Sequence, residues 1–401
     1  MSVRICNVIT RMIVGGPQQV SLLVGDYYRD RPGFEYHLFS GTESGAEGDY
    51  HEELRAHGIA WHPVPELVRE LRPATDLRAV AALVRLLRAL RPEIVHARSA
   101  KARLVGPLAA RIARVPVVVQ TVHGWSFNNA VDARKPLFVQ LEKVSRALSD
   151  CTVFVSEDDL DEGARLGIVS RDARARGRAE VIRDPVDLAA FQRLSNSARS
   201  ALRTSLGVGT ATPVVSLVQR LSEPKTPLVF VEAMKTVATR DRTVAIWIVG
   251  DGRLREPTER AIVDAGLAPR TRFLGLRKDV AALLSASDVV VHSSVREGLP
   301  LVVLETLSVG SPLVATAVGG VPEVVRDGEN GLLVPPSDPE ALARAVEATL
   351  ADPDAARLRA EAGRRAVEPF SATHRLEEQH ALYLRLLRRR GIAVPGGTRS
   401  A

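Results

Sequence analysis

The sequence has little cysteine and few aromatic residues. Its 401 residues include only two cysteines, Cys6 and Cys151, which lie far apart in apolar runs. This number excludes a disulfide scaffold and a four-ligand zinc site built on cysteine, and it indicates a reducing compartment. Aromatic residues make up 4% of the chain and are not interleaved with basic residues, which is unlike a surface that stacks nucleic-acid bases.

Long hydrophobic runs are also missing. No stretch of about 18 or more residues is apolar throughout. The first twelve residues carry Arg4 and Arg11 around a short apolar run and contain no small-residue cleavage pattern. We therefore expect a soluble, unexported, cytoplasmic protein, with attachment to the inner face of the membrane as the alternative.

Lysine is rare: it accounts for 6 of the 54 basic residues, so the net charge of +7 rests on arginine. The charge is uneven, because residues 69–114 hold 11 Lys or Arg against Glu70, Asp76 and Glu93, an excess of +8. Two interpretations of this region stay open. The cations either form solvated helix faces or offer a surface to an anionic membrane or a phosphorylated acceptor.

The rest of the composition is that of a globular protein, with 45% hydrophobic and 25% charged residues, and the chain is too long for one core. Short β-branched runs alternate with helical patterns, which is typical of parallel sheets covered by helices on both faces. The sequence therefore predicts an α/β protein of two doubly wound, Rossmann-like domains. The expected strands fall in two series, 3–9, 36–40, 93–96, 116–122 and 152–155, then 213–218, 244–249, 272–274, 288–292, 312–315 and 331–334.

The break between the domains is expected at the proline turn Asp184-Pro185, which follows a strand-like run and precedes a polar stretch. After residue 369 a helical pattern comes too late to complete another strand-helix-strand unit. We predict an N-terminal domain over 1–185, a C-terminal domain over 186–371, a late helix over 372–391 and a disordered tail over 392–401.

Ligands of open parallel sheets bind beyond the carboxyl ends of the strands, so the loops at these ends are where we expect chemistry. The strand ending at Val218 is followed by Arg220, Lys225, Thr226 and Pro227. Thr226 suits an N-cap and Pro227 the first helical position, which puts Lys225 at a helix N-terminus. Two cations beside free backbone N–H groups suit a diphosphate, and solvated loop charges are the alternative.

A second informative loop follows the fourth strand of the second series. Glu297 precedes Gly298 at the expected start of a helix, and Glu305 lies in the second turn of that helix. Gly298 lets the backbone approach a ligand, and Glu305 interrupts an otherwise apolar helix with a charge. The spacing alone carries no weight, because Glu35 and Glu43 share it. In this context, carboxylates near phosphate-binding cations indicate hydroxyl donors such as those of a sugar or a ribose.

Together these motifs make the chain resemble a retaining glycosyltransferase of family 4, whose GT-B fold has two Rossmann-like domains and an interdomain cleft. The resemblance spans nearly the whole chain. It implies transfer of a sugar from a nucleotide diphosphate donor to an acceptor bound by the N-terminal domain, without a cofactor. It further implies that the helix over 372–391 crosses back onto the first domain and that the domains close over the donor. The motifs are Gly15-Gly16, Thr121-Val122-His123-Gly124, Arg220 and Lys225, Gly250-Asp251-Gly252, Phe273-Leu274-Gly275, and Glu297 through Glu305.

The resemblance also implies roles for individual residues. Arg220 and Lys225 would neutralise the departing diphosphate. Glu297 would bind hydroxyls of the donor sugar, and His123 would touch that sugar near the reacting centre. Leu276 and Arg277 would lie against the base, and Glu305 would bind the ribose diol. The whole donor-binding set is Gly15, Gly16, Gly250, Leu276, Arg277, Gly298, Leu299 and Glu305.

The acceptor is expected in the first domain, beside the ends of two strands. Arg98 and Lys101 are cations near aromatic residues, a combination that favours an anionic acceptor, either lipid-linked or a small molecule. The chain departs from the usual family pattern at Arg98, where a second histidine is common, and at Asp184-Pro185, where Asn-Gly is common. The predicted acceptor-binding set is His96, Arg98, Lys101, Trp125 and Phe127.

Two acidic pairs have the spacing that metal-dependent transferases use. Asp159-Leu160-Asp161 and Asp352-Pro353-Asp354 both sit at acidic helix starts, and we predict no essential metal. Two alternatives to a transferase stay open. One is a nucleotide-sugar epimerase of the same fold, which would need further acid and base carboxylates near His123. The other is a basic protein that binds nucleic acid or an anionic membrane.

Overall fold

The computed structural model describes residues 2–45, 48–129 and 134–395. The chain divides into two compact units, which we describe separately. Unit 1 comprises Met1–Asp184 and the segment from Thr373 onward, and unit 2 comprises Pro185–Ala372. This division falls one residue before the predicted boundary. Of the predicted tail, residues 396–401 lie outside the described residues.

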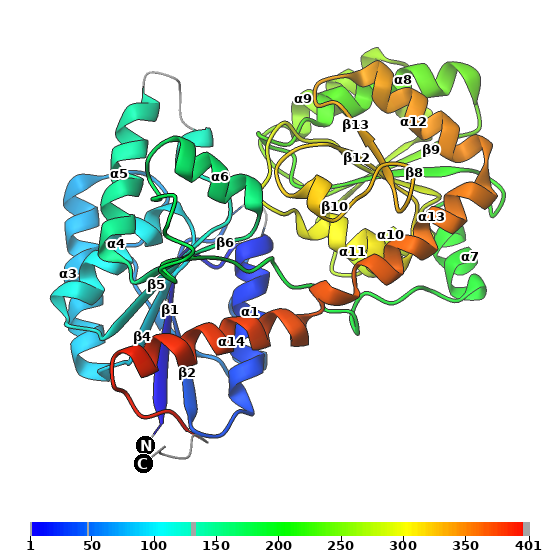
Figure 1. The fold of residues 1–401 in the computed structure, drawn as a ribbon. Coiled ribbons are helices and arrows are strands. Elements are labelled where there is room, and N and C mark those ends of the chain that lie inside the picture. The colour runs from blue at the N-terminus through cyan, green and yellow to red at the C-terminus, as the bar shows by residue number, and fades with distance from the viewer. Residues whose placement is uncertain (1, 46–47, 130–133, 396–401) are drawn as a thin grey trace. The chain divides into compact units, whose positions relative to one another are not determined.

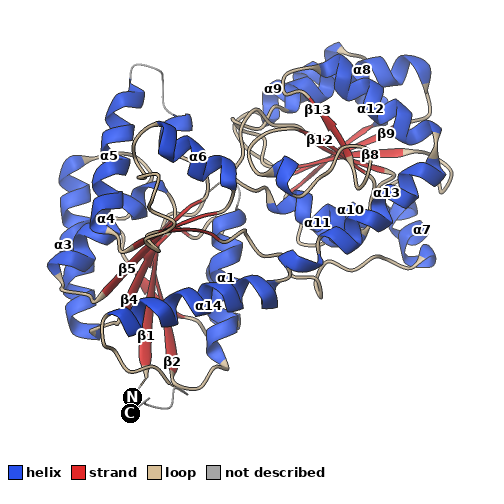
Figure 2. Cartoon of the chain, viewed as in Figure 1, coloured by secondary structure: helices blue, strands red, loops and turns tan. Residues whose placement is uncertain are grey.

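Unit 1 is built on a seven-stranded parallel sheet with the order β3-β2-β1-β4-β5-β6-β7. Helices α3, α4 and α5 stand side by side on one face, and α1 and α14 lie on the other (Figure 1 and Figure 2). The strands are β1 Val3–Arg11, β2 Phe34–Gly41, β3 Ala60–Pro63, β4 Ile94–Ala97, β5 Val117–Val122, β6 Cys151–Phe154 and β7 Ala179–Val181. The helices are α1 Gly16–Arg29, α2 His51–Ala56, α3 Pro73–Leu90, α4 Ala100–Ile112, α5 Lys135–Leu148, α6 Glu157–Arg165 and α14 Ala372–Arg389.

The patterns that predict these elements also account for their burial. All six residues of β5 are buried, as expected for a central parallel strand with helices on both faces. In α3, Val80, Leu83, Val84 and Leu87 recur at helical spacing and are the residues that face the core. The α/β architecture therefore follows from alternating strand-like and helix-like runs.

Unit 2 is built on a six-stranded parallel sheet with the order β10-β9-β8-β11-β12-β13. Its core gathers residues from β8, β9, β11, α8 and α12. The strands are β8 Val214–Val218, β9 Ala245–Val249, β10 Thr271–Gly275, β11 Val289–His292, β12 Leu313–Thr316 and β13 Leu332–Val334. The helices are α7 Asn196–Ser205, α8 Pro227–Arg240, α9 Arg255–Asp264, α10 Val280–Ala286, α11 Leu301–Val309, α12 Pro339–Ala351 and α13 Pro353–Ala366.

The strand order reverses once in each unit. In unit 1, β1 lies between β2 and β4, and in unit 2, β8 lies between β9 and β11. The connections on the two sides of such a point leave in opposite directions, which opens a crevice at the carboxyl ends of the strands. Loops that are far apart in the sequence, those after β8 and β11, are thereby brought together.

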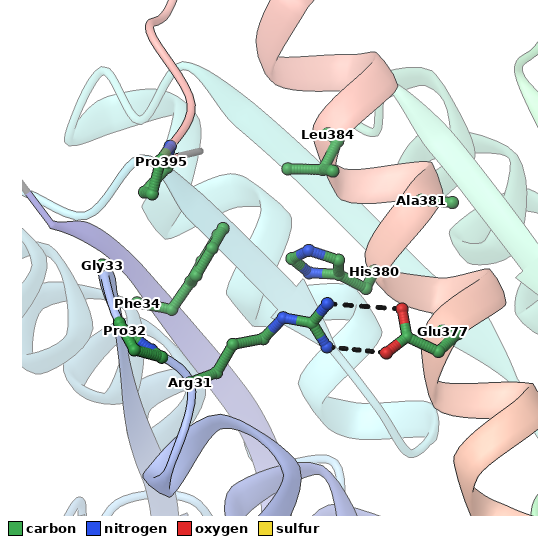
Figure 3. Close-up of a pocket in the computed structure, with 9 residues that line it drawn as sticks. All are labelled: Arg31, Pro32, Gly33, Phe34, Glu377, His380, Ala381, Leu384 and Pro395. Atoms are coloured by element: carbon green, nitrogen blue, oxygen red, sulfur yellow. Dashed lines mark hydrogen bonds and ion pairs between the residues drawn. The ribbon is translucent and has the colours of Figure 1, made fainter. Parts of the chain in front are cut away.

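Helix α14 packs against α1 in unit 1. Arg31, just beyond α1, forms an ion pair of 2.8 Å with Glu377, and the Tyr28 hydroxyl lies 3.1 Å from His380 Nδ1. Arg31, Glu377 and His380 line an open hollow of about 690 Å³ that Pro395 also borders (Figure 3). Within the described ranges, no helix is both long enough and apolar enough to cross a membrane.

Candidate active site

The loops after β8 and β11 are joined by backbone hydrogen bonds. The Val295 N–H donates to the Pro224 carbonyl at 3.1 Å, and the Thr226 N–H donates to the Ser293 carbonyl at 3.3 Å. Because β8 and β11 are neighbours in the sheet, their loops leave the same edge and can pair in this way. The pairing fixes Lys225, at the start of α8, opposite the loop that carries Glu297.

Lys225 and Glu297 form an ion pair in which both side chains are mostly buried. His292, the last residue of β11, is fully buried, and its Nε2 lies 3.2 Å from Glu297 Oε1. Burial alone would raise the pKa of Glu297, but the Lys225 ammonium and His292 outweigh it and lower this pKa to about 2. Glu297 is therefore an anion at any physiological pH.

Sequence reasoning missed His292. Burial, followed by the nearby charge of Lys225, lowers its pKa, and the Glu297 carboxylate opposes that shift. Within the described part of the chain, neither Nδ1 nor Nε2 makes a hydrogen bond. The sequence did place His292 at the end of a predicted strand, directly before the loop that contains Glu297. A histidine in an apolar run is more often a core residue, so the signal was weak.

Glycines let neighbouring loops approach this cluster closely. A Cβ on Gly319, in the loop after β12, would lie 2.0 Å from the Glu297 carbonyl oxygen, and Gly319 has a φ of +53°. A Cβ on Gly250, in the loop after β9, would lie 2.1 Å from the Gln219 carbonyl oxygen. Only glycine fits at such positions. Gly250-Asp251-Gly252 thus supports the loop of Arg220 and Lys225, and the role of Gly319 was not visible in the sequence.

The other predicted donor-site residues of unit 2 follow the same edge of the sheet. Arg220 is exposed in the loop between β8 and α8. Gly298 and Leu299 are buried just before α11, and Glu305 is 7% exposed in the second turn of that helix. After β10, Leu276 is 44% exposed and Arg277 makes two hydrogen bonds to Asp279, at 2.7 and 2.6 Å.

In unit 1, Gly15, Gly16, Arg98 and His123 follow the ends of β1, β4 and β5. Gly15 precedes α1 in extended conformation, and Gly16 is the first residue of that helix. His123 follows β5, and its Nδ1 lies 3.0 Å from Asp184 Oδ2. Arg98, directly after β4, approaches His123 Nε2 with Nη1 at 3.5 Å. Three residues from distant segments thus meet at one edge of the sheet.

The predicted acceptor residues lie in the interior of unit 1. Trp125 and Phe127 stack on each other inside a hydrophobic cluster and are 2% and 4% exposed. Lys101 is buried and pairs with Asp76. His96 is buried between Tyr383 and Thr121. The structure therefore does not gather these side chains, with Arg98, into an open surface, and acceptor binding by them stays a prediction.

Comparison with known proteins identifies the family. Residues 15–176 match the model of the glycosyl transferase 4-like domain, and residues 212–352 match that of glycosyl transferases group 1. An alpha-maltose-1-phosphate synthase of Mycolicibacterium smegmatis is 30% identical over 341 residues, which cover 80% of this chain and 86% of that protein. The chain belongs to the family 4, or group 1, glycosyltransferases. The predicted enzyme class is confirmed, and the epimerase and binding-protein alternatives are not favoured.

One further relative of this glycosyltransferase and one solved structure are informative. A UDP-Gal:alpha-D-GlcNAc-diphosphoundecaprenol alpha-1,3-galactosyltransferase of Escherichia coli is 29% identical over 348 residues, 86% of this chain and 87% of that protein. The crystal structure of HepE from Anabaena with UDP and glucose superposes with a TM-score of 0.81 at 24% identity, over 96% of this chain and 99% of that one. The latter likeness confirms the GT-B fold.

Proposed function

We propose that this glycosyltransferase moves a sugar from a nucleotide diphosphate sugar to an acceptor bound by unit 1, with retention of configuration and without an essential metal. The observation that carries the proposal is the Lys225–Glu297–His292 cluster at the switch point of unit 2, with Arg220 on the same loop as Lys225. Retention is typical of the family. The site offers what such a transfer needs, which is charge neutralisation at a leaving diphosphate and acceptors for sugar hydroxyls.

The leaving diphosphate gains negative charge as the glycosidic bond breaks. Lys225 lies two residues before α8, whose first N–H groups have no partner within the helix. A cation and a helix N-terminus act together on the same developing charge. We assign Arg220 and Lys225 to this role, because stabilisation of developing charge is commonly the largest single contribution to catalysis.

Glu297 presents a carboxylate that stays ionised, so it can accept hydrogen bonds from donor-sugar hydroxyls. Lys225 donates a hydrogen bond to this carboxylate. Arrival of the diphosphate gives Lys225 a second anion, and the sugar hydroxyls then replace part of its contact with Glu297. Glu305 is assigned to the ribose diol, Leu276 and Arg277 to the base, and His123 to the donor sugar.

The names of the relatives suggest the first donor to test. The E. coli relative is named for UDP-Gal, and the Anabaena protein was crystallised with UDP and glucose. We propose a uridine diphosphate hexose as donor. The E. coli relative is also named for a sugar carried on diphosphoundecaprenol, which supports an anionic acceptor for this chain.

A membrane-bound acceptor would be consistent with one surface of unit 1. Helix α3 and the end of α4 form a shallow groove in which Leu77 is 69% and Ile112 is 45% exposed. Arg85 and Arg88 border the groove and match the charge of an anionic lipid surface. We therefore include peripheral contact with an anionic membrane in the proposal.

The test is a panel of UDP, GDP and ADP, each with its hexose conjugates, in thermal unfolding and turnover assays. A nucleotide at 100 times its dissociation constant stabilises the fold by about 2.7 kcal/mol. We expect UDP to raise the melting temperature and a UDP-hexose to be turned over. Absence of any shift and any turnover across the panel contradicts the proposed donor. Sedimentation with vesicles of phosphatidylglycerol, compared with phosphatidylcholine, tests the membrane contact separately.

A further inference from the structure

A buried ion pair joins helices α4 and α5 next to the loop that carries His123. Arg103 of α4 pairs with Glu142 of α5, and their side chains are 1% and 5% exposed. The two helices stand side by side on one face of the unit 1 sheet (Figure 1). None of the roles assigned above involves this pair.

Both members of the pair also hold the backbone at the end of β5. Arg103 Nη1 donates to the Thr121 carbonyl at 3.4 Å, and the Ser126 N–H donates to Glu142 Oε1 at 3.4 Å. The same Oε1 accepts from Arg103 Nη2, and a carboxylate oxygen has two lone pairs for these two donors. His123 lies between the two attachment points. The pair therefore holds the segment from Thr121 to Ser126 at both of its ends.

The residues between these attachment points have little conformational freedom. Gly124 directly follows His123 and has a φ of +91°, a conformation that favours glycine. Trp125 is 2% exposed, and its Nε1 donates to the Asp159 carbonyl at 2.8 Å. Arg103 also contributes here, because its guanidinium carbon lies 6.0 Å from the centroid of the Trp125 ring. The turn is thus anchored by a buried indole and, at both ends, by the ion pair.

The stability of the fold does not by itself account for the pair. Two charges lose their hydration when they are buried, and apolar side chains of similar volume often stabilise a fold at least as well. Arg103 Nε has no hydrogen-bond partner among the residues that the structure describes, which adds the cost of an unsatisfied buried donor. The two charged side chains supply hydrogen bonds to the loop backbone, which apolar side chains would not supply.

We propose that Arg103 and Glu142 are positioning residues that fix the loop after β5 and, through it, the place of the His123 side chain. The inference rests on the proposed function, in which His123 touches the donor sugar. A displacement of about 1 Å at such a contact can lower a rate on the order of 10²-fold. Arg103 and Glu142 act on the reaction only through the backbone, so their loss affects turnover and leaves the diphosphate-binding groups of unit 2 in place.

The test is the double variant Arg103→Met/Glu142→Leu, which removes both charges together and leaves neither unpaired. It keeps apolar side chains of similar length between α4 and α5, so a role in helix packing alone is preserved. We expect the Ser126 amide to exchange with deuterium faster, on the order of 10-fold, because its acceptor is gone. The amides of β2, at Phe34–Gly41, should keep rates within about twofold of the parent. An unchanged Ser126 rate in the folded variant overturns the proposal.

The second measurement is turnover of UDP-glucose and UDP-galactose by the same variant. We expect the turnover number to fall on the order of 10²-fold and the dissociation constant of UDP to change by less than about twofold. A folded variant with a turnover number within about threefold of the parent overturns the proposal. If the parent chain turns over no nucleotide sugar, the proposed function fails instead, and the Ser126 exchange rate still decides whether the pair fixes the loop.

A matched control is available on the same helix. Arg111 of α4 pairs with Asp150 at 3.0 Å and donates Nε to the Leu148 carbonyl at 2.8 Å. These contacts lie at the amino end of β5, because Asp150 Oδ2 accepts from the Val118 N–H. Arg111→Met should therefore leave both the Ser126 exchange rate and the turnover number within about twofold of the parent. Equal losses in Arg111→Met and in the double variant would overturn the proposal.

Arg103→Lys provides the same test if the double variant does not fold. A lysine keeps a cation opposite Glu142 but lacks the planar fork that also reaches the Thr121 carbonyl. We expect a turnover number lower on the order of 10-fold and an unchanged dissociation constant for UDP. A turnover number equal to that of the parent overturns the proposal.

Discussion

Replacement of Lys225 by alanine should affect both turnover and stability. The substitution removes one of the two cations assigned to the leaving diphosphate. Loss of one preorganised donor at a developing charge costs about 3–4 kcal/mol, or about 10²–10³ in the turnover number. The Michaelis constant for the donor should change less, because the charge to be stabilised develops mainly in the transition state.

The same substitution leaves Glu297 without its cation. The side chains of Lys225 and Glu297 are 16% and 11% exposed, so the pair behaves as a buried one. Removal of one partner from a buried pair costs about 3 kcal/mol, because the remaining charge stays poorly solvated. Lys225→Ala should therefore lower the free energy of unfolding by about this amount. The control Lys235→Ala, at an exposed lysine of α8, should cost less than about 0.5 kcal/mol.

The double variant Lys225→Ala/Glu297→Gln separates the two effects. It removes the stranded carboxylate, so the free energy of unfolding should recover by about 2 kcal/mol relative to Lys225→Ala. Turnover should not recover, because the diphosphate still lacks its cation and the sugar its carboxylate. Initial rates of nucleotide release and urea unfolding measure the two quantities. A folded Lys225→Ala protein with turnover within threefold of the parent, about 0.7 kcal/mol, would refute the assignment.

Three further predictions concern the same chain. The pKa of Glu297 is lowered to about 2 in the folded state, so the stability that this carboxylate contributes is present above its usual pKa and is lost as the pH falls toward 2. Acidification from about pH 4.5 to pH 2.5 should therefore lower the free energy of unfolding less in Glu297→Gln than in the parent. The difference should be up to about 3 kcal/mol. Gly319→Ala should lower turnover on the order of 10²-fold, because the new Cβ displaces the Glu297 loop. The control Gly328→Ala should not lower it, because Gly328 has a φ of +76° but its Cβ would have no neighbour within 4 Å. Equal effects would contradict the claim that Gly319 is needed for close approach to Glu297. Burial raises the pKa of Cys151 to about 12 and also raises that of Cys6. A thiol reagent at about pH 8 should therefore modify neither cysteine in the native protein and both cysteines after unfolding. Rapid labelling of the native protein would contradict the burial of the two thiols.

The strands of unit 2 could be predicted because most of them are short runs of apolar and β-branched residues. All six observed strands, from β8 to β13, overlap the six expected ones. In unit 1, β3 at Ala60–Pro63 was missed, because its burial pattern has no fully buried residue and its sequence gives no alternation. An edge strand with so little burial is specified by pairing with β2 rather than by its own pattern.

The proximity of the loops after β8 and β11 could be predicted from the sequence, because both loops follow strand ends whose backbone position the topology fixes. The direction of side chains could not be predicted by the same rule. Trp125 follows β5, yet its indole turns into the core and donates to the Asp159 carbonyl at 2.8 Å. Lys101 follows β4, yet it is buried against Asp76, a partner 25 residues away.

The excess of positive charge over residues 69–114 was also only partly informative. Three of its 11 cations, Arg98, Lys101 and Arg103, are buried and have partners inside unit 1. A charge count treats buried and exposed cations alike, because it does not show which of them have partners inside the fold. Lys101 pairs with Asp76, inside the counted region. Glu142, the partner of Arg103, lies outside the counted region altogether.

The central claim, retaining transfer from a nucleotide diphosphate sugar, is tested most directly by the configuration of the first product. The measurement is the proton NMR spectrum of the anomeric region, recorded from the first minutes of turnover of a UDP-α-hexose with the parent chain. Glu297→Gln and Lys225→Ala serve as low-activity controls. The account predicts that the α-anomer forms first and that any β-anomer arises later by mutarotation. An initial product of β-configuration would contradict retention.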